Sequence, residues 1–337
     1  MAKIKSLGEF GLIDLVSRKF KHRLRNTVLP LGDDCAAYSA SPSKNQLVST
    51  DALVENIHFK FSTISPQQLG QKAIAVNISD IAAMGGTPTR VLITLGIPKK
   101  VSTSFLDQLY KGIHKACKLY NVELFGGDTV SSPKCFFINI TIIGEAEQGK
   151  LFTRGGAKKG DLIFATGTLG DSSLGLKMLS KKNWKCSSSS RKYLLKKHLT
   201  PVPRLKESRL LAKSNRQVTS MIDISDGLTQ DLHHICKQSK VGAIIYEENL
   251  PQSSAFSKVC SDNNLSPLPL ILNGGEDYEL LFTLSPDGVK NLIRQFQKAE
   301  ALVTQIGEIT QPSKNVSLLK KNGKREILPQ SSGFNHF

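Results

Sequence analysis

The chain has 337 residues, which is enough for two domains of ordinary size. Hydrophobic residues make up 39% and charged residues 22%, as in soluble globular proteins, and no apolar run approaches the roughly 20 residues that a membrane helix needs. The formal net charge is +17, but the lysines form many short pairs without interleaved aromatic residues, so we expect a lysine-rich solvated surface and neither a nucleic-acid nor a membrane partner.

The first half of the chain alternates strand and helix signals. A short strand at 47–50 is expected to deliver Asp51 at its end. A helix is predicted from Ser65, as N-cap before Pro66, toward Gly85. A second helix, capped by Ser104, carries an apolar residue every four positions and ends at Asn121. Further strands are predicted at 90–97, 122–125 and 135–144.

The second half repeats the alternation after a polar stretch at 145–150, so we expect one domain over 1–148 and another over 149–337. The predicted strands are 161–166, 218–224 and 278–284, and the predicted helices are 172–179 and 227–237. Asn322-Gly323 predicts a tight hairpin, and the basic, serine-rich residues 183–192 predict a mobile surface loop. The mixture predicts a two-domain α/β (α+β) protein.

The six cysteines are scattered and contain no C-x-x-C pair, which argues against a zinc knuckle or a disulfide framework. The histidines form no H-E-x-x-H motif, so a transition-metal site is not expected. The first residues lack the apolar block and cleavage site of a secretory signal, and we therefore expect a cytoplasmic protein.

The most informative feature is a set of acidic residues placed beside glycines or at strand ends in a basic protein. Nine of the 28 acidic residues belong to it: Asp33, Asp34, Asp51, Asp80, Asp128, Asp223, Asp226, Glu276 and Asp277. In such apolar surroundings a carboxylate needs a positive partner. Converging carboxylates without Cys or His ligands favour Mg²⁺ over softer metals, and the neighbouring glycines allow backbone N–H groups to approach phosphate oxygens. A turn capped by its own carboxylate is the alternative for any single motif.

Other nucleotide-binding motifs are missing from the sequence. There is no G-x-x-x-x-G-K-[ST] loop, no protein-kinase signature set and no G-x-S-x-G nucleophile elbow. ATP would therefore be held in another way, and no covalent nucleophile is expected.

Taken in order, the motifs resemble the thiamine-monophosphate kinase family, in the superfamily that also contains aminoimidazole ribonucleotide synthetase. The match runs along nearly the whole chain through the segments GEFGLIDLVSR, LGDDCA, STDALVENIHF, KAIAVNISDIAAMGG, GGDTV, TRGGAKKGD, TGTLGDSSLGL, IDISDGL, NGGEDYELLFT and SGFNHF. The start, STDALVENIHF and the end resemble this kinase specifically, whereas GGDT and ISDG occur in several members.

The resemblance implies a role for each of thirteen residues. Several Mg²⁺ ions would be held by Asp34, Thr50, Asp51, Asp80, Asp128, Asp223 and Asp226. ATP would be contacted by Gly127, Asp128, Arg154 and Ser225. The substrate, thiamine monophosphate, would be contacted by His58, Glu276 and Phe334.

The resemblance also implies a homodimer in which the sheet of each N-terminal domain joins that of its partner, with the active site between the two domains. The implied reaction is direct in-line transfer of a phosphoryl group from ATP to thiamine monophosphate, which forms thiamine diphosphate in the last step of its biosynthesis. Two alternatives stay open: another ATP-using enzyme of the superfamily with a different acceptor, and a basic nucleic-acid-binding protein.

Overall fold

Among the residues that the structure describes, six strands form the first sheet, in the spatial order β1-β2-β3-β6-β4-β5. Their bounds are β1 Thr27–Leu29, β2 Ala36–Ser41, β3 Lys44–Val54, β4 Thr87–Ile97, β5 Glu123–Ser131 and β6 Phe137–Glu147. Within this sheet β4 and β5 pair in parallel and the other neighbours pair antiparallel. The computed structural model describes residues 26–29, 33–181, 183–214, 217–311, 315–330 and 333–334, so the opening motif at 8–18 and the last three residues lie outside the described part.

Helix α2 (Pro66–Ala83) packs against this sheet and against helix α3 (Thr103–Tyr120). Ser65 Oγ accepts the N–H of Gln68 while Gln68 Oε1 accepts the N–H of Ser65, which is a capping box and confirms the predicted start. A Cβ at Gly70 would lie 2.3 Å from the carbonyl oxygen of Leu109, so this glycine permits the close approach of the two helices. Thirteen of the 18 residues of α2 are buried, because other structure covers the helix on nearly every side.

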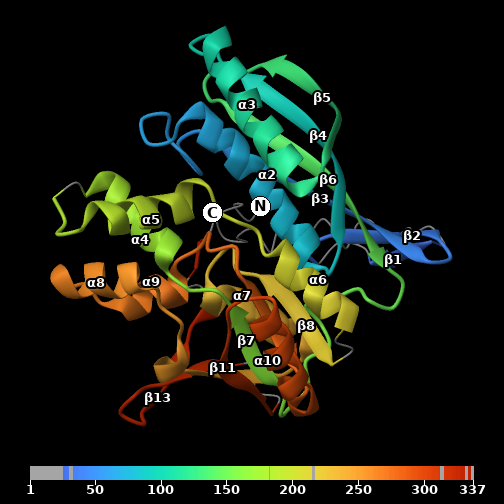
Figure 1. Cartoon of the computed structure of the whole chain (residues 1–337), viewed down its shortest axis with the longest axis vertical. Coiled ribbons are helices and arrows are strands. Elements are labelled where there is room, and N and C mark those ends of the chain that lie inside the picture. The colour runs from blue at the N-terminus through green and yellow to red at the C-terminus, as the bar shows by residue number, and fades with distance from the viewer. Residues whose placement is uncertain are drawn as a thin grey trace, which may run out of the picture.

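In the described part of the second half, seven strands form the second sheet, in the order β13-β12-β9-β11-β7-β10-β8. Their bounds are β7 Leu162–Thr166, β8 Val218–Asp223, β9 Gly242–Tyr246, β10 Leu280–Leu284, β11 Val303–Thr310, β12 Val316–Leu319 and β13 Arg325–Leu328. The helices of this half are α4 Asp171–Ser180, α5 Ser188–Leu199, α6 Leu205–Ser214, α7 Leu228–Ser239, α8 Ser254–Asp262, α9 Pro267–Asn273 and α10 Val289–Lys298. Figure 1 shows the two sheets in separate halves of the molecule, with α2 between them.

The central strands of the second sheet are buried on both faces. On β7, Ile163 belongs to one hydrophobic cluster and its neighbour Phe164 to another, because successive side chains of a strand point to opposite faces. Phe164 stacks on Phe282 of β10, with ring centroids 5.6 Å apart. Helices therefore cover both sides of these strands, which confirms a mixed α/β architecture.

Helix α2 also connects the two halves. Ser79 Oγ of α2 donates to Asp223 Oδ2 at the end of β8 over 2.6 Å, and Ser208 Oγ of α6 donates to the carbonyl oxygen of Ala82. The last two turns of α2 are thus fixed against the second half of the chain. The division into 1–148 and 149–337 stays a prediction.

Two predicted strands end too early because their pairing was not foreseen. The strands predicted at 47–50 and 122–125 extend to Val54 and Ser131, since pairing with β6 and β4 continues beyond the local apolar pattern. Asp51 accordingly lies inside β3 and not at its end.

Two serine-based predictions are also wrong. Ser102, not Ser104, caps α3, because Ser102 Oγ accepts the N–H of Phe105. The predicted loop 183–192 contains the first turn of α5, which begins at Ser188 after its N-cap Ser187.

The strand predicted at 278–284 begins later, at Leu280, whereas the predicted hairpin is confirmed. The Asn322-Gly323 hairpin joins β12 to β13, and Gly323 has a φ of 78°, in the left-handed region that such turns require. All six cysteines are free thiols, as expected. Among the described residues, none of the helices combines the length and the apolar character needed to span a bilayer.

Candidate active site

Three carboxylates from distant parts of the chain meet where the two halves touch. Asp34 precedes β2, Asp80 lies in the last turns of α2, and Asp223 ends β8. One oxygen atom from each lies within 4.8 Å of the others, and the group is mostly buried. These three residues are called the acidic cluster below. The structure thus brings together three of the seven residues expected to hold magnesium.

Hydroxyl groups and one guanidinium fix the orientation of the acidic cluster. Ser49 Oγ of β3 donates to Asp80 Oδ2 over 2.6 Å, and Ser79 makes the bond to Asp223 described above. Arg154 Nη2 donates to Asp34 Oδ1 over 2.6 Å. The second oxygen, Asp34 Oδ2, is buried and has no hydrogen-bond partner among the described residues. A buried oxygen of this kind is an acceptor suited to a cation.

Burial and the charges of neighbouring carboxylates disfavour ionisation of Asp33, Asp80 and Asp223. Burial, followed by the charge of Asp34, raises the pKa of Asp223 to about 7. Burial, followed by the charge of Asp51, raises the pKa of Asp80 well above its usual value. Burial and the Asp34 charge likewise raise the pKa of Asp33 to about 7. Several carboxylates confined in this way store a repulsion that a bound cation would relieve.

Two other residues expected to hold magnesium, Asp51 and Thr50, lie on β3 and face the acidic cluster differently. Asp51 is exposed and acts electrostatically on Asp80 and Asp223, so it adjoins the acidic cluster. Thr50 follows Ser49 on β3 and its hydroxyl donates to the carbonyl oxygen of Ile140, on the face opposite to the Ser49–Asp80 bond. Any contribution of Thr50 to the cluster would therefore come from its backbone carbonyl.

Asp128 lies apart from the acidic cluster. It is exposed on β5, the edge strand, and its Oδ1 accepts the N–H of Thr129 over 2.8 Å. Its neighbour Gly127 pairs with Ile93, and a Cβ there would lie 2.0 Å from the carbonyl oxygen of Ile93. The sequence pattern GGDT thus forms part of a strand, with glycine required by the close pairing of β4 and β5.

The residues expected to contact the substrate lie near the loop that follows β8. The backbone N–H of Phe334 donates to the carbonyl oxygen of Asp226 over 3.0 Å, and Phe334 is 43% exposed. The rings of Phe334 and His58 lie 6.2 Å apart, and His58 Nδ1 accepts the N–H of Val54. Since Nδ1 is an acceptor, the proton of a neutral His58 ring is on Nε2.

Glu276 and Ser225 are joined through their backbones. The N–H of Glu276 donates to the carbonyl oxygen of Ser225 over 2.7 Å. The Glu276 carboxylate lies 2.7 Å from Lys72 Nζ of α2. The structure therefore places the ISDG and NGGED motifs side by side at the boundary between the two halves.

Two residues beside the site, Asp231 and Lys72, were not identified from the sequence. One of the nine acidic residues that were selected from it, Asp277, has a structural role. Asp231 Oδ2 accepts the N–H groups of Asp226 and Gly227, and it forms a second group of possible ligands with Asp226 and His234. Asp277 accepts the N–H groups of Gly170 and Ser172 at the start of α4. Lys72 was also missed, although a lysine within the apolar run KAIAV was a usable signal.

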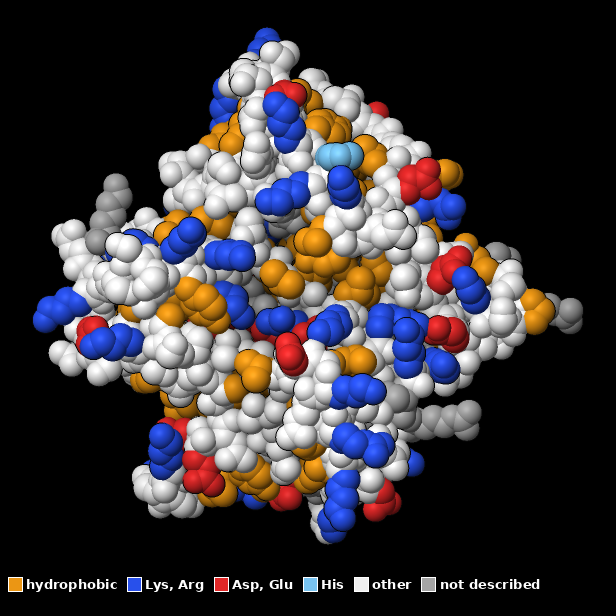
Figure 2. All heavy atoms as spheres, viewed as in Figure 1, with side chains coloured by type: hydrophobic (Ala, Val, Ile, Leu, Met, Phe, Trp, Pro, Cys, Tyr) orange, Lys and Arg blue, Asp and Glu red, His pale blue; other side chains and the backbone are white. Residues whose placement is uncertain are grey.

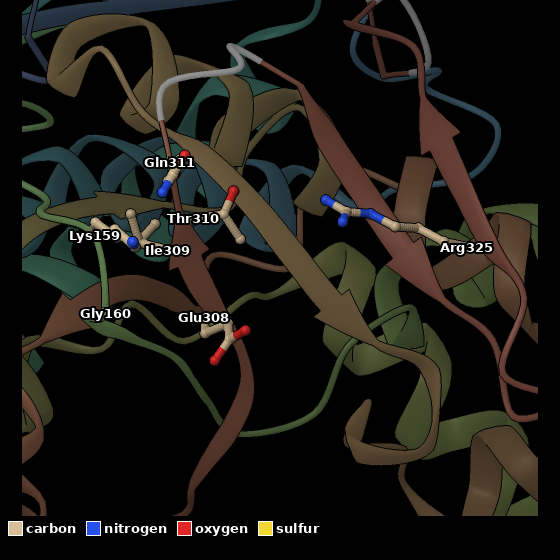
Figure 3. A pocket seen from close by; sticks show the side chains of 7 residues that line it. All are labelled: Lys159, Gly160, Glu308, Ile309, Thr310, Gln311 and Arg325. Carbon is tan, nitrogen blue, oxygen red and sulfur yellow. The ribbon is translucent and has the colours of Figure 1, made fainter.

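A separate cavity of about 420 Å³ lies on the second sheet (Figure 3), lined by Lys159, Gly160, Glu308, Ile309, Thr310, Gln311 and Arg325. None of the thirteen expected site residues lines it. Figure 2 shows Lys and Arg side chains spread over the whole of one face, with acidic side chains among them near the boundary of the two halves. We therefore assign the chemistry to the boundary and not to this cavity.

Comparison with known families defines the class of this protein. The N-terminal domain of AIR synthase related proteins matches residues 32–146, and the corresponding C-terminal domain matches residues 158–320. Together they cover most of the chain in the order in which the two sheets occur. The chain is therefore an AIR synthase related protein with both domains of that family.

More similar relatives narrow this class. The thiamine-monophosphate kinase of Buchnera aphidicola subsp. Schizaphis graminum is 39% identical over 98% of this chain and 99% of its own length. That of Bacillus subtilis is 36% identical over 98% of this chain and 100% of its own length. A solved structure of AaThiL complexed with AMPPCP and TMP superposes with a TM-score of 0.86 at 33% identity, covering 100% of this chain and 99% of the other. The chain belongs to the thiamine-monophosphate kinase family, which confirms the resemblance found in the motifs.

Proposed function

We propose that this enzyme transfers the γ-phosphoryl group of ATP to the phosphate of thiamine monophosphate, in the last step of thiamine diphosphate biosynthesis. The observation that carries the proposal is the acidic cluster, formed by Asp34, Asp80 and Asp223 where the two halves of the chain meet. Two findings support the choice of substrates. The relatives are thiamine-monophosphate kinases, and one similar structure is complexed with AMPPCP and TMP.

The donor set of the acidic cluster fits Mg²⁺. Each of its three ligand atoms is a carboxylate oxygen. One further oxygen, Asp34 Oδ2, is buried without a partner among the described residues. Several Mg²⁺ ions would be held by Asp34, Asp80 and Asp223 with Asp51 and Asp226, aided by the Thr50 carbonyl and by Asp128. Bound magnesium would neutralise phosphate charge, which is the chemistry that phosphoryl transfer between two polyanions needs.

The ATP side of the site comprises Gly127, Asp128, Arg154 and Ser225. Arg154 is the positive group closest to the acidic cluster that we find in the described part of the chain, and it bonds to Asp34. Its fork of donors suits phosphate oxygens. We propose that Arg154 orients the polyphosphate chain beside the cluster.

The acceptor side comprises His58, Glu276 and Phe334. The exposed ring of Phe334, beside His58, offers an apolar face on which a flat heterocycle can stack. Glu276 offers a carboxylate to the amino and cationic groups of that heterocycle. These three residues would leave the phosphate of the acceptor directed toward the acidic cluster.

The chemical step needs no side-chain nucleophile. An oxygen of the acceptor phosphate forms a bond to the γ-phosphorus as the bond from that phosphorus to the β,γ-bridging oxygen breaks, and ADP leaves. A phosphate monoester is already an anionic nucleophile near neutral pH, so the chain has mainly to align two anions in line and exclude water.

The test is product formation by the purified chain with ATP, Mg²⁺ and thiamine monophosphate, followed by chromatography. We expect thiamine diphosphate from the monophosphate, none from free thiamine and none in EDTA. Another ATP-using enzyme of the superfamily would bind ATP with Mg²⁺ but act on a different acceptor in a substrate panel. Failure to bind ATP would contradict the proposal, and salt-dependent binding to unrelated oligonucleotides would support the nucleic-acid alternative.

We also propose a homodimer built on strand β5. Strand β5 lies at the edge of the first sheet, and all nine of its residues are exposed. Three of them are apolar: Leu124, Phe125 and Val130. An exposed edge strand with apolar side chains is a template for pairing with another strand. A second copy of the chain would cover it, and the active site would then lie near the interface through Asp128. The expected location of this dimer is the cytoplasm, where its co-substrate ATP is made.

Replacing Phe125 by aspartate is expected to weaken the dimer, because Phe125 is 61% exposed in the single chain and would place a charge in the interface. We expect the dimer dissociation constant to rise by at least about tenfold, the scale of losing one buried aromatic side chain. Light scattering across a dilution series measures it. Leu302→Asp, at a leucine that is 68% exposed in the second half, is the matched control and should leave the mass unchanged. A monomeric wild-type chain would contradict the proposal.

A further inference from the structure

Lys72 is a buried charge that the reaction scheme above leaves without a role. It lies in α2 with only 1% of its side chain exposed, beside the buried Ala73 and Ile74. A buried ammonium is strongly destabilising unless an opposite charge compensates it. Its Nζ lies 2.7 Å from Glu276 Oε1, which provides that charge from the other half of the chain.

Both carboxylate oxygens of Glu276 contact a basic side chain. Oε1 faces Lys72, and Oε2 lies 3.2 Å from Nδ1 of His198 in α5. The side chain of Glu276 is 24% exposed, whereas those of Lys72 and His198 are 1% and 5% exposed. Glu276 is therefore the one side chain of these three that is partly open to solvent.

The backbone around Glu276 is held in a conformation that side chains avoid. Glu276 has a φ of 64° and Tyr278 a φ of 51°. The N–H of Glu276 bonds to Ser225 and that of Tyr278 to Ile224, so the loop is fixed to the end of β8. Strain of this kind persists where the surroundings impose it, and it is concentrated at functional sites.

The contact with Ser172 does not make this group a nucleophilic triad. Ser172 Oγ lies 3.1 Å from His198 Nδ1, the same nitrogen that faces Glu276. A serine–histidine–carboxylate relay needs the serine and the carboxylate on opposite nitrogens of the ring. The role of the group is therefore to position the carboxylate and not to attack a substrate.

We propose that Lys72 is a positioning residue that anchors Glu276, so that the partly exposed carboxylate receives an N–H donor or the cationic ring of the acceptor. This inference rests on the proposed function. Lys72 and Asp80 are eight residues apart on α2, which is roughly 12 Å along a helix axis. Helix α2 thereby sets the distance between the carboxylate that recognises the acceptor and the acidic cluster where phosphates meet.

The test is the variant Lys72→Met, which keeps the length of the side chain and removes its charge. We expect the KM for thiamine monophosphate to rise at least about tenfold, as for a lost charged contact, while kcat and the KM for ATP change by less than about threefold. Lys111→Met removes an exposed lysine that pairs with Asp107 in the same half, and it should change neither KM. Equal changes in both KM values, or an unchanged acceptor KM, would overturn the proposal.

A double variant separates positioning from a purely structural role. Glu276→Gln should raise the acceptor KM in the wild-type background but add little in the Lys72→Met background, because the two residues act as a unit. Additive losses would mean that Lys72 only supports the fold. If Lys72→Met proves unstable because it leaves Glu276 unpaired, Lys72→Met with Glu276→Gln should restore thermal stability and retain the high acceptor KM.

The two proposals can fail separately. A wild-type chain that converts thiamine monophosphate, together with a Lys72→Met variant of unchanged acceptor KM, would overturn only the role of Lys72. Calorimetric titration of thiamine monophosphate in the presence of AMPPCP and Mg²⁺ gives a second readout that needs no turnover, and we expect the variant to bind at least about tenfold more weakly. A wild-type chain that neither converts nor binds thiamine monophosphate would overturn both.

Discussion

The variant Asp51→Asn is expected to lower kcat by about 10³-fold, the upper range for losing one group that stabilises charge in the transition state. Asparagine has nearly the same shape as aspartate, so the change removes charge and leaves packing intact. Asp51 is exposed on β3 and its charge acts on Asp80 and Asp223, which places it at the edge of the acidic cluster toward solvent. The measurement is steady-state turnover of ATP and thiamine monophosphate at saturating Mg²⁺.

The matched control for this variant is Asp107→Asn, which removes an exposed aspartate of α3 that pairs only with surface groups in the described contacts. It should retain wild-type turnover. Circular dichroism and a thermal melt of Asp51→Asn should resemble the wild type, since an exposed carboxylate contributes little to stability. Wild-type turnover by Asp51→Asn would remove Asp51 from the active site.

Magnesium is expected to stabilise the chain in a pH-dependent way. The pKa of Asp33 and that of Asp223 are raised from 3.8 to about 7, mainly by burial and then by Asp34. In EDTA the folded chain therefore binds more protons at these groups than the unfolded chain does between about pH 4 and pH 7. The contribution of Asp33 and Asp223 to the free energy of unfolding therefore falls as pH rises through this window.

Bound Mg²⁺ is expected to offset this fall in the free energy of unfolding, because the cation favours the ionised carboxylates. At pH 8 we expect saturating Mg²⁺ to raise the melting temperature by roughly 4 °C, the shift for a single ligand present at about 100 times its dissociation constant. The shift should shrink toward pH 5, where protons compete with the cation for the same oxygens. Thermal melts with EDTA or Mg²⁺ at each pH provide the measurement.

Asp80→Asn is the informative variant for the magnesium effect. The amide keeps an oxygen that can accept the hydrogen bond from Ser49, but it removes one charge from the cluster. We expect a higher melting temperature than the wild type in EDTA at pH 8 and a much smaller response to Mg²⁺. A Mg²⁺ response that is independent of pH, or equal in this variant, would contradict a cation held by the acidic cluster.

The sequence correctly predicted the ends of those elements that are set by residues close by in the chain. Ser65, Pro66 and Gln68 specify the start of α2 through a capping box, and the Asn322-Gly323 pair specifies the β12–β13 turn. These interactions span three or four residues, so the sequence contains all that they need. The prediction of Ser104 as the N-cap of α3 was wrong because serine is a good N-cap at either position, and only the path of the entering chain selects Ser102.

The lengths of strands were decided by their partners. β3 runs on to Val54 and β5 to Ser131 because β6 and β4 continue to pair with them. Nothing in the local pattern of VELFGGDTV indicates that two glycines and an aspartate extend a strand. The same pairing placed the Thr50 hydroxyl on the face away from the acidic cluster.

The sequence by itself determined the chemical character of the site: carboxylates beside glycines in a basic chain, the order of motifs that indicates a kinase family, and the thirteen candidate residues. Only the tertiary structure decided which of them meet. Asp34, Asp80 and Asp223 are brought together by α2 between two sheets, whereas Asp128 remains on an exposed edge of the single chain. Lys72 and Glu276 form a pair across 204 positions, since a buried charge selects its partner by distance in space and not along the chain.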